Sequence, residues 1–452
     1  MSKKRLIWFC HGTIDSIDQS QVLARLRDEI GLTTIMPENP ICHTSGFSIS
    51  NELAQRGPFE DWRTRQNLWP KAAEGIYPPV AGIVSGFDDT PLLRLIESAH
   101  NAGIEVWGHL GLWSYGGDVY PEYAMQDIDG HPLDTNYKQW GIGLCPSRSA
   151  INEWTRDCLI EAARRYALDG FCLDHARYPA PANLHSLSAC GCTHCQREAE
   201  LLGYDFPRLR DGILHFQRRL QQLDRRRLKR ILAHQPNLWD FLALCVEGPT
   251  VLEWFRMRAG LLAARMREFR LALEQATGKT QPFGSDVFPP SVALLGGHDY
   301  AAWSEGAAYL TGGSSFGGVV GWATMVTNLA SEWAPALCRL IPDLEEKDAL
   351  ELVYRIFGYD AFSLPQTLSG LRLDALPITE IFAHEVAKLK AVAPNSLDLY
   401  PPISVSAAPD KVEAFCAAVI NHDCDGAMLS FAADEETLAR ILNLNLGKWL
   451  GS

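Results

Sequence analysis

The feature that most limits the fold is a regular alternation of short apolar segments with helical segments along the whole chain. Helical segments lie between many of the apolar ones; Ser20 is the predicted N-cap of the first, and Gly31 closes it. Alternation of this kind is typical of a parallel sheet whose strands are joined by helical crossovers. The segments predicted as strands are 6–10, 32–36, 80–84, 104–107, 170–174, 281–286, 308–311, 397–405 and 425–431.

The number of predicted strands favours an α/β fold of the (β/α)8 TIM-barrel type. No Pro/Gly/Ser-rich linker interrupts the chain, so we expect a single elaborated domain over residues 1–452. Residues 206–279 have an almost wholly helical pattern, and we expect a helical insertion at 200–279, after the fourth strand. A doubly wound open sheet is the alternative, but no Gly-rich phosphate loop follows the first strand.

The overall charge and the distribution of cysteines limit the partners and the compartment. A net charge of −13 disfavours a nucleic acid or an anionic membrane as partner. No segment approaches the length of a membrane span, and the apolar run at 6–10 is too short for a signal peptide. Cys10, Cys172 and Cys416 lie inside apolar segments, which is typical of reduced core cysteines. We therefore expect a cytoplasmic protein without nucleic-acid or membrane partners.

A basic stretch between residues 218 and 230 leaves two interpretations open. It contains six arginines and one lysine within a helical pattern. Such a face is most often solvated or in contact with another copy of the chain, so a homo-oligomer is one expectation. An anion-binding site is the alternative.

Polar residues follow several of the predicted strands. In a parallel barrel, side chains at the C-terminal ends of the strands share one bowl. Asp174 and Asp286 each end an apolar strand, which makes them a candidate carboxylate pair, and Glu38 is a rival acid. The full set of predicted strand-end groups is His11, Glu38, His109, Asp174, His175, Arg177, Asp286 and Tyr400.

A pair of carboxyl groups at this end of a barrel is what glycoside cleavage requires. One carboxylate attacks the sugar or activates water, and a protonated carboxyl group protonates the leaving oxygen. Each Asp has an alternative role as a loop cap, and Arg177 is near enough in sequence to form a plain ion pair with Asp174. Aromatic rings near the strand ends are the expected sugar platforms: Trp107, Trp113 and Tyr178. The polar groups expected to bind sugar hydroxyls or to steady the charge of Asp174 are His11, His109, His175 and Arg177.

Two other classes of function use the same strand ends. A metal-dependent hydrolase or sugar isomerase would use His11, Glu38, His109 and Asp174 as ligands. Against it, the first strand ends in Cys-His-Gly and lacks the paired His-x-His ligands of amidohydrolase-type barrels. A non-catalytic carbohydrate-binding barrel is the third interpretation.

A cluster of cysteines follows the strand predicted at 170–174. Cys190, Cys192 and Cys195 form a C-x-C-x-x-C pattern, and such a turn can offer three thiolates to a tetrahedral Zn²⁺. Cys145, in Gly-Leu-Cys-Pro-Ser just before a predicted helix, is the candidate fourth ligand. Four thiolates leave no open position on the metal, so we expect a structural zinc and no organic cofactor. Free thiols or a redox pair are the alternatives.

Three of these segments together resemble a known family. The segments 143–147 (GLCPS), 170–174 (GFCLD) and 190–195 (CGCTHC) resemble the barrel domain of family-42 β-galactosidases and related family-10-like hydrolases. The segments 127–132 and 297–303 are also similar to pieces of those hydrolases, and the resemblance covers residues 100–200 best. In family-42 enzymes, four cysteines in this order hold a structural zinc beside the active site. The resemblance implies the same role for Cys145, Cys190, Cys192 and Cys195.

One departure from that family concerns the catalytic acid. Family-42 enzymes have an Asn-Glu pair at the fourth strand end, with the Glu as acid/base. This chain has Asp174 there, followed by His-Ala-Arg177, and no Glu. An Asp at this place resembles the nucleophile of α-glycosidase barrels. The sequence therefore favours a glycoside hydrolase or transglycosidase with a carbohydrate substrate, but not an ordinary retaining β-galactosidase.

Overall fold

The computed structural model describes most of the chain. The described residues are 4–11, 19–37, 47–65, 83–85, 88–113, 116–117, 119–133, 143–181, 186–233, 249–312, 321–432, 434–444 and 446. The strands are β1 (Arg5–His11), β2 (Thr34–Pro37), β3 (Phe47–Ile49), β4 (Ile83–Ser85), β5 (Glu105–Gly111), β6 (Gly170–Asp174), β7 (Phe283–Val287), β8 (Tyr309–Gly312), β9 (Asp398–Tyr400), β10 (Pro402–Ser404) and β11 (Gly426–Ala432).

The helices fall mostly where the periodic segments predict them. They are α1 (Gln19–Arg25), continued by a π turn (Leu26–Ile30), α2 (Asn51–Arg56), α3 (Trp62–Arg65), α4 (Thr90–Asn101), α5 (Ser149–Arg165), α6 (Thr193–Leu201), α7 (Phe206–Gln221), α8 (Arg225–Leu232), α10 (Thr250–Thr277), α11 (Ala293–Gly296), α12 (Tyr300–Trp303), α13 (Gly321–Leu340), α14 (Glu346–Phe357), α15 (Ile378–Val392), α16 (Pro409–Asn421) and α17 (Glu435–Asn443), with short 3₁₀ turns at Leu368–Gly370 and Leu373–Ala375.

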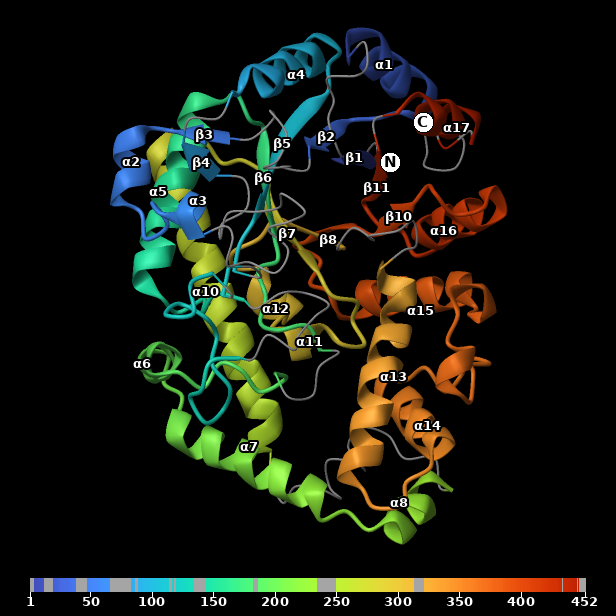
Figure 1. Cartoon of the computed structure of the whole chain (residues 1–452). Helices are drawn as coiled ribbons and strands as arrows, with labels where there is room; N and C mark the ends of the chain where they lie inside the picture. The colour runs from blue at the N-terminus through green and yellow to red at the C-terminus, as the bar shows by residue number, and fades with distance from the viewer. Residues whose placement is uncertain are drawn as a thin grey trace.

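The large sheet is a parallel barrel surrounded by helices (Figure 1). Its strand order is β10-β11-β1-β2-β5-β6-β7-β8-β9. Only Pro401 separates β9 from β10; β9 pairs with β8 and β10 pairs with β11, so the two occupy one barrel position and close the sheet. Counted in this way, the nine strands fill eight positions, and the predicted (β/α)8 TIM barrel is confirmed.

The short strand predicted around residues 80–84 does not belong to the barrel. β4 pairs with β3 in a separate two-stranded parallel sheet, and residues 80–82 lie outside the described part of the chain. Its apolar residues resemble those of a barrel strand, so the sequence pattern alone does not separate the two.

β6 shows how the sequence places a carboxylate at a strand tip. Its residues are buried except Asp174, which is partly exposed at the C-terminal end. A side chain on Gly170 would come within 2.9 Å of the Pro282 carbonyl oxygen and of the Trp107 ring. Glycine at this position therefore lets β6 lie close to its neighbours, with the carboxylate held at the rim of the barrel.

The barrel interior is filled by one apolar layer beneath that rim. Side chains alternate between the two faces of a strand, so His109 and Asp174 point inward like Trp107 and Cys172, two residues before them. The layer consists of Ile7, Phe9, Met36, Trp107, Cys172, Tyr309, Tyr400 and Met428, all buried. The charged and imidazole groups therefore sit above a packed floor.

In the described part of the chain between β6 and β7 lie the helices α6, α7, α8 and α10. α10 packs along α5 and α7, and α7 and α8 cross the lower end of the molecule toward α14 in Figure 1. Among the described residues, no helix has both the length and the apolar composition needed to cross a lipid bilayer.

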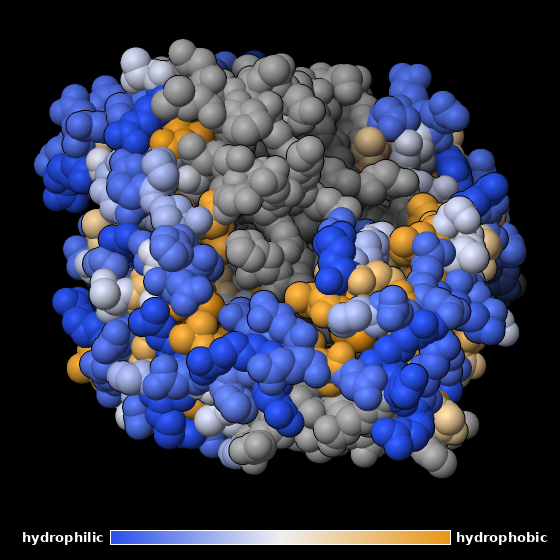
Figure 2. Space-filling model, turned by 60° about the horizontal axis from the view of Figure 1, so that its bottom comes forward, coloured by the Kyte–Doolittle hydropathy of each residue, from blue (hydrophilic) through white to orange (hydrophobic). Residues whose placement is uncertain are grey.

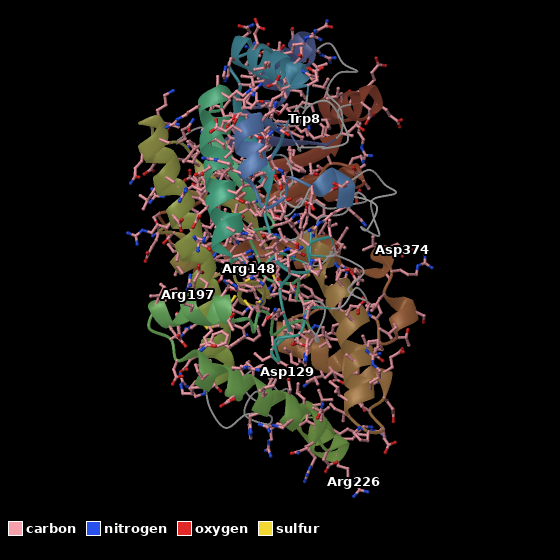
Figure 3. All side chains as sticks on the ribbon, turned by 60° about the vertical axis from the view of Figure 1, so that its left-hand side comes forward. Trp8, Asp129, Arg148, Arg197, Arg226 and Asp374 are labelled. Carbon is pink, nitrogen blue, oxygen red and sulfur yellow. The ribbon has the colours of Figure 1, made fainter. Side chains whose placement is uncertain are left out.

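The basic stretch on α7 and α8 is partly used within the chain. On α8, Lys229 Nζ lies 3.1 Å from Asp348 Oδ2 of α14, and Arg225 also pairs with Glu345. Arg226 is exposed and points away from the molecule in Figure 3. Figure 2 turns this end toward the viewer and shows a mostly hydrophilic surface there. A contact between copies of the chain through this surface stays a prediction.

Candidate functional site

The structure brings Asp174 and Asp286 together at the rim of the barrel. They end the neighbouring strands β6 and β7, and their carboxyl groups are in hydrogen-bonding contact. The backbone N–H of His175 also donates to Asp286 Oδ1 at 3.1 Å. Because two carboxylates both accept hydrogen bonds, this contact requires one of the pair to carry a proton.

The surroundings of Asp286 affect its charge. Burial raises the pKa of Asp286 above its ordinary value, because desolvation disfavours the charged form. The contact with Asp174, the hydrogen bond from the His175 N–H and the positive charge of Arg177 lower the pKa of Asp286, but they do not reverse the shift. Burial therefore makes Asp286 easier to protonate than an aspartate in water.

Two histidines surround the Asp174 carboxylate. His175 Nδ1 lies 3.3 Å and His109 Nε2 lies 3.8 Å from Asp174 Oδ2. Burial lowers the pKa of His175 well below its ordinary value, and the charges of Arg177 and His109 add to this effect. His175 is therefore a neutral imidazole near pH 7, which can donate a hydrogen bond without cancelling the charge of Asp174.

The turn after β6 has an unusual backbone. His175 has φ of 58°, in the left-handed region that residues other than glycine seldom adopt. In this conformation its N–H reaches Asp286 while its side chain stays beside Asp174. Backbone geometry of this kind is concentrated at functional sites.

Arg177 lies behind the pair rather than in the bowl. It is 5% exposed, its guanidinium carbon lies 5.6 Å from the centre of the Phe288 ring, and Nη1 donates to the Tyr178 carbonyl at 3.2 Å. Its charge favours the ionised form of Asp286. Its contribution to the site is therefore electrostatic.

A residue absent from the predicted set, His298, joins the loops that follow β6 and β7. Its Nδ1 accepts the Phe288 N–H at 2.9 Å, so the ring proton is on Nε2, which donates to the Ala176 carbonyl at 3.2 Å. Burial lowers the pKa of His298 to about 3, so the ring keeps this tautomer at neutral pH. The only sign of His298 in the sequence was that it lies in the segment 297–303, which is similar to a piece of the hydrolases named above.

The predicted aromatic platforms lie in the core, which corrects their assignment. Trp107 and Trp113 are each 1% exposed and Tyr178 is fully buried. Trp107 belongs to the interior layer, and Trp113 Nε1 donates to Asn152 Oδ1 at 3.0 Å. A ring without exposed surface offers no face to a sugar, so these side chains pack the protein instead.

Three further residues were predicted at strand ends. Tyr400 is buried in the interior layer, and its hydroxyl donates to Asp398 Oδ2 at 3.0 Å. His11 ends β1, but its side chain lies outside the described residues, as does the whole of Glu38.

The four predicted cysteine ligands form a compact buried cluster. The Sγ atoms of Cys145, Cys190, Cys192 and Cys195 all lie within 4.8 Å of one another. Cys145 Sγ is 3.5 Å from the Sγ atoms of both Cys192 and Cys195. Zinc–sulfur bonds of about 2.3 Å place tetrahedral sulfurs about 3.8 Å apart, so the cluster fits a metal ion. In the described part of the chain, no other His, Cys, Asp or Glu groups form such a cluster.

Backbone groups support the sulfurs. The N–H of Gln126 donates to Cys190 Sγ at 3.2 Å, and the N–H of Cys195 donates to Cys192 Sγ at 3.4 Å. Donors of this kind stabilise thiolates and orient them toward a metal. Gly191 lies so close to the 126–131 turn that a Cβ would come 2.4 Å from the Asp127 carbonyl oxygen. The spacing of the cysteines thus depends on glycine at this position.

Comparison with known proteins bears on the fold. No known family model matches the chain, and no curated protein sequence matches it. Among solved structures, the PgaB (BpsB) glycoside hydrolase domain from Bordetella bronchiseptica is 8% identical, with a TM-score of 0.55 over 98% of this chain and 97% of that one. The β-amylase catalytic domain from Paenibacillus polymyxa is 10% identical, with a TM-score of 0.49 and 98% of each chain covered.

A β-galactosidase from the psychrophilic Marinomonas ef1 is also 10% identical, with a TM-score of 0.47 over 98% of this chain and 59% of that one. At such identities the likeness shows the fold alone. The predicted resemblance to glycoside hydrolase barrels is confirmed at that level.

Proposed function

We propose that the chain is a glycoside hydrolase that uses Asp174 and Asp286 at the C-terminal rim of its barrel. The observation that carries this proposal is the contact between an acid favoured by burial and a carboxylate flanked by imidazoles, on neighbouring strands. Glycoside cleavage uses one protonated and one ionised carboxyl group, and we assign the proton to Asp286 because burial raises its pKa.

In the proposed reaction, Asp286 is the general acid. It donates its proton to the oxygen of the leaving sugar as the glycosidic bond breaks. Asp174 is the carboxylate that attacks the anomeric carbon or activates water for that attack. His109 and His175 hold Asp174 in place, and His175 remains neutral, so it does not cancel the negative charge with which Asp174 stabilises the positive charge developing on the sugar.

The contact between the two carboxyl groups describes the free enzyme. Carboxyl groups on either side of a glycosidic bond lie about 5–9.5 Å apart. A bound substrate therefore replaces Asp174 as the hydrogen-bond partner of Asp286. This exchange delivers the proton of Asp286 to the glycosidic oxygen and leaves Asp174 ionised.

For the cysteine cluster we propose a structural Zn²⁺. Cys145, Cys190, Cys192 and Cys195 would hold it, and four thiolates leave no position for substrate or water. The cluster ties the loop after β6 to the segment that precedes α5. Its proposed contribution is to fix the loop that begins at Asp174, and the metal takes no part in bond cleavage.

A screen of the purified protein against a panel of oligosaccharides and aryl glycosides tests the activity. We expect release of reducing sugar from at least one member of the panel. Asp174→Asn should abolish turnover of that substrate while leaving its binding intact, as measured by calorimetry. Asp299→Asn is the matched control, because Asp299 caps α12 on the loop after β7 and Asn caps helices equally well. Unchanged turnover in Asp174→Asn, or sugar binding without any turnover, would contradict the proposal.

A further inference from the structure

Arg258, in the middle of α10, is a fully buried cation. It is 0% exposed, and its guanidinium lies against the rings of Tyr178 and Phe255. Nη1 donates to the Leu187 carbonyl and Nη2 donates to the Leu295 carbonyl at 3.3 Å. Among the described residues, no carboxylate pairs with it, and its Nε has no hydrogen-bond partner.

A buried charge of this kind needs compensation. Placing a guanidinium in a low-dielectric interior is costly unless an opposite charge lies nearby. Burial lowers the pKa of Arg258 to about 10, so the group is still charged at neutral pH. Carbonyl dipoles alone satisfy some of its N–H groups but supply no net negative charge.

The cysteine cluster is the negative group within reach. Four thiolates around a divalent ion carry a net charge of about −2. The Arg258 guanidinium carbon lies 4.3 Å from the centre of the Tyr178 ring, and the Tyr178 hydroxyl lies 3.9 Å from Cys195 Sγ. Tyr178 thus contacts both the cation, through its ring, and the cluster, through its hydroxyl.

The carbonyl partners of Arg258 come from separate loops. Leu187 precedes the cysteine turn, and Leu295 lies in α11 on the loop after β7. Tyr178 belongs to the loop after β6, and its N–H donates to the Gly296 carbonyl at 2.9 Å. The Arg258 side chain therefore contacts the loop after β6, which begins at Asp174 and carries the cysteines, and also the loop after β7.

We propose that Arg258 is the buried counter-charge of the metal–thiolate cluster and a positioning residue that joins the loop after β6, which carries the cysteines, to the loop after β7. This inference rests on the proposed metal site and is independent of the proposed hydrolase activity. It assigns to α10 a role in metal affinity that its sequence does not signal.

Metal affinity is the first test. The Zn²⁺ affinity of the full chain is measured by competition with a chromophoric chelator, for wild type, Arg258→Met, Arg258→Lys and Arg270→Met. Arg270 is the matched control on the same helix, where it pairs with Glu274 at 3.0 Å and is partly exposed. Loss of a group that supports metal ligands typically weakens affinity by about 10–100-fold. We expect that loss in Arg258→Met, a loss below about tenfold in Arg258→Lys, which keeps the charge, and none in Arg270→Met.

Stability with and without metal separates a charge effect from a packing effect. We expect Arg258→Met to lower the unfolding midpoint of the zinc-loaded protein, but not of the chelated protein, in which wild type carries the uncompensated cation. Equal destabilisation of both forms, or wild-type zinc affinity in Arg258→Met, would overturn the proposal.

If Arg258→Met does not fold, Arg258→Lys tests whether the positive charge supports zinc binding. A loss of zinc affinity of more than about 100-fold in this variant, which keeps the charge, would rule out the charge as the cause. Failure of wild type to bind zinc would overturn this inference while leaving the oligosaccharide screen unaffected.

Discussion

Gly191 is the position at which a single methyl group tests the geometry of the cysteine loop. A Cβ there would lie 2.4 Å from the Asp127 carbonyl oxygen and 2.8 Å from the Ile128 carbonyl oxygen, whereas real Cβ contacts are almost never under 3.0 Å. Both obstacles are backbone atoms, so neither can rotate away. In Gly191→Ala the loop has to move by about 0.6 Å or more, and overpacking of this kind typically costs about 1–3 kcal/mol.

The same displacement affects the metal ligands. Gly191 stands between Cys190 and Cys192, and its N–H donates to the Gln126 carbonyl at 3.2 Å. Moving this residue shifts two sulfurs and weakens the hydrogen bond from Gln126 to Cys190 Sγ. We therefore expect Gly191→Ala to lower the free energy of unfolding by about 1–3 kcal/mol in urea and to reduce zinc content after dialysis.

Gly260→Ala is the control for this substitution. Gly260 lies within α10, and a Cβ there would have its closest contact with the Tyr204 hydroxyl at 3.4 Å. Alanine in a helix interior is about 1 kcal/mol more favourable than glycine, so this variant should be as stable as wild type or more stable. Gly191→Ala with wild-type stability and full zinc content would refute the packing of the cysteine loop against the 126–131 turn.

Three other predictions concern the pair, the loops and the metal. Burial raises the pKa of Asp286, so the folded state holds this proton more tightly than the unfolded state, and wild type loses stability as the pH rises above the ordinary value of 3.8. Urea unfolding should show Asp286→Asn more stable than wild type near pH 7 and equal to it below about pH 4; an advantage that does not grow with pH would contradict the shift. His298→Ala leaves the buried Phe288 N–H without its acceptor, so we expect a loss of about 2–4 kcal/mol in the same assay, with a smaller loss in His298→Asn; a neutral Ala variant would contradict the role of His298. Mild EDTA treatment should leave hydrolysis unchanged, whereas activity lost in EDTA and restored by Mn²⁺ or Mg²⁺ would favour the metal-dependent isomerase.

The sequence predicts those parts of the site that depend on local pattern. The apolar run before Asp174 ends abruptly in a charge, which places that residue at a strand tip in any parallel barrel. Asp286 likewise ends an apolar run. The two carboxyl groups meet because their strands, β6 and β7, are neighbours in the barrel. Cys190, Cys192 and Cys195 were found from their spacing, and Cys145 from its place before a predicted helix and from the resemblance to family-42 enzymes.

Other parts depend on how segments distant in sequence meet. Trp107 lies two residues before His109 on the same inward face, so it is one layer deeper and packs the interior instead of lining the bowl. From the sequence, Arg258 is expected to be a solvated helix residue, because only the folded chain places Tyr178 against it, beside the cysteines. His298 acquires its role only because its ring fits between two loops that are more than a hundred residues apart in the chain.

Turnover of a series of aryl glycosides tests most directly whether Asp286 is the general acid and Asp174 the nucleophile or base. A leaving phenol of low pKa departs without protonation, so a missing general acid matters less as the phenol becomes more acidic. We expect Asp286→Asn to be slow on poor leaving groups and to approach wild-type turnover on the best one, while Asp174→Asn stays inactive throughout the series. Wild-type turnover in Asp174→Asn, or the same dependence on the leaving group in both variants, would contradict the assignment.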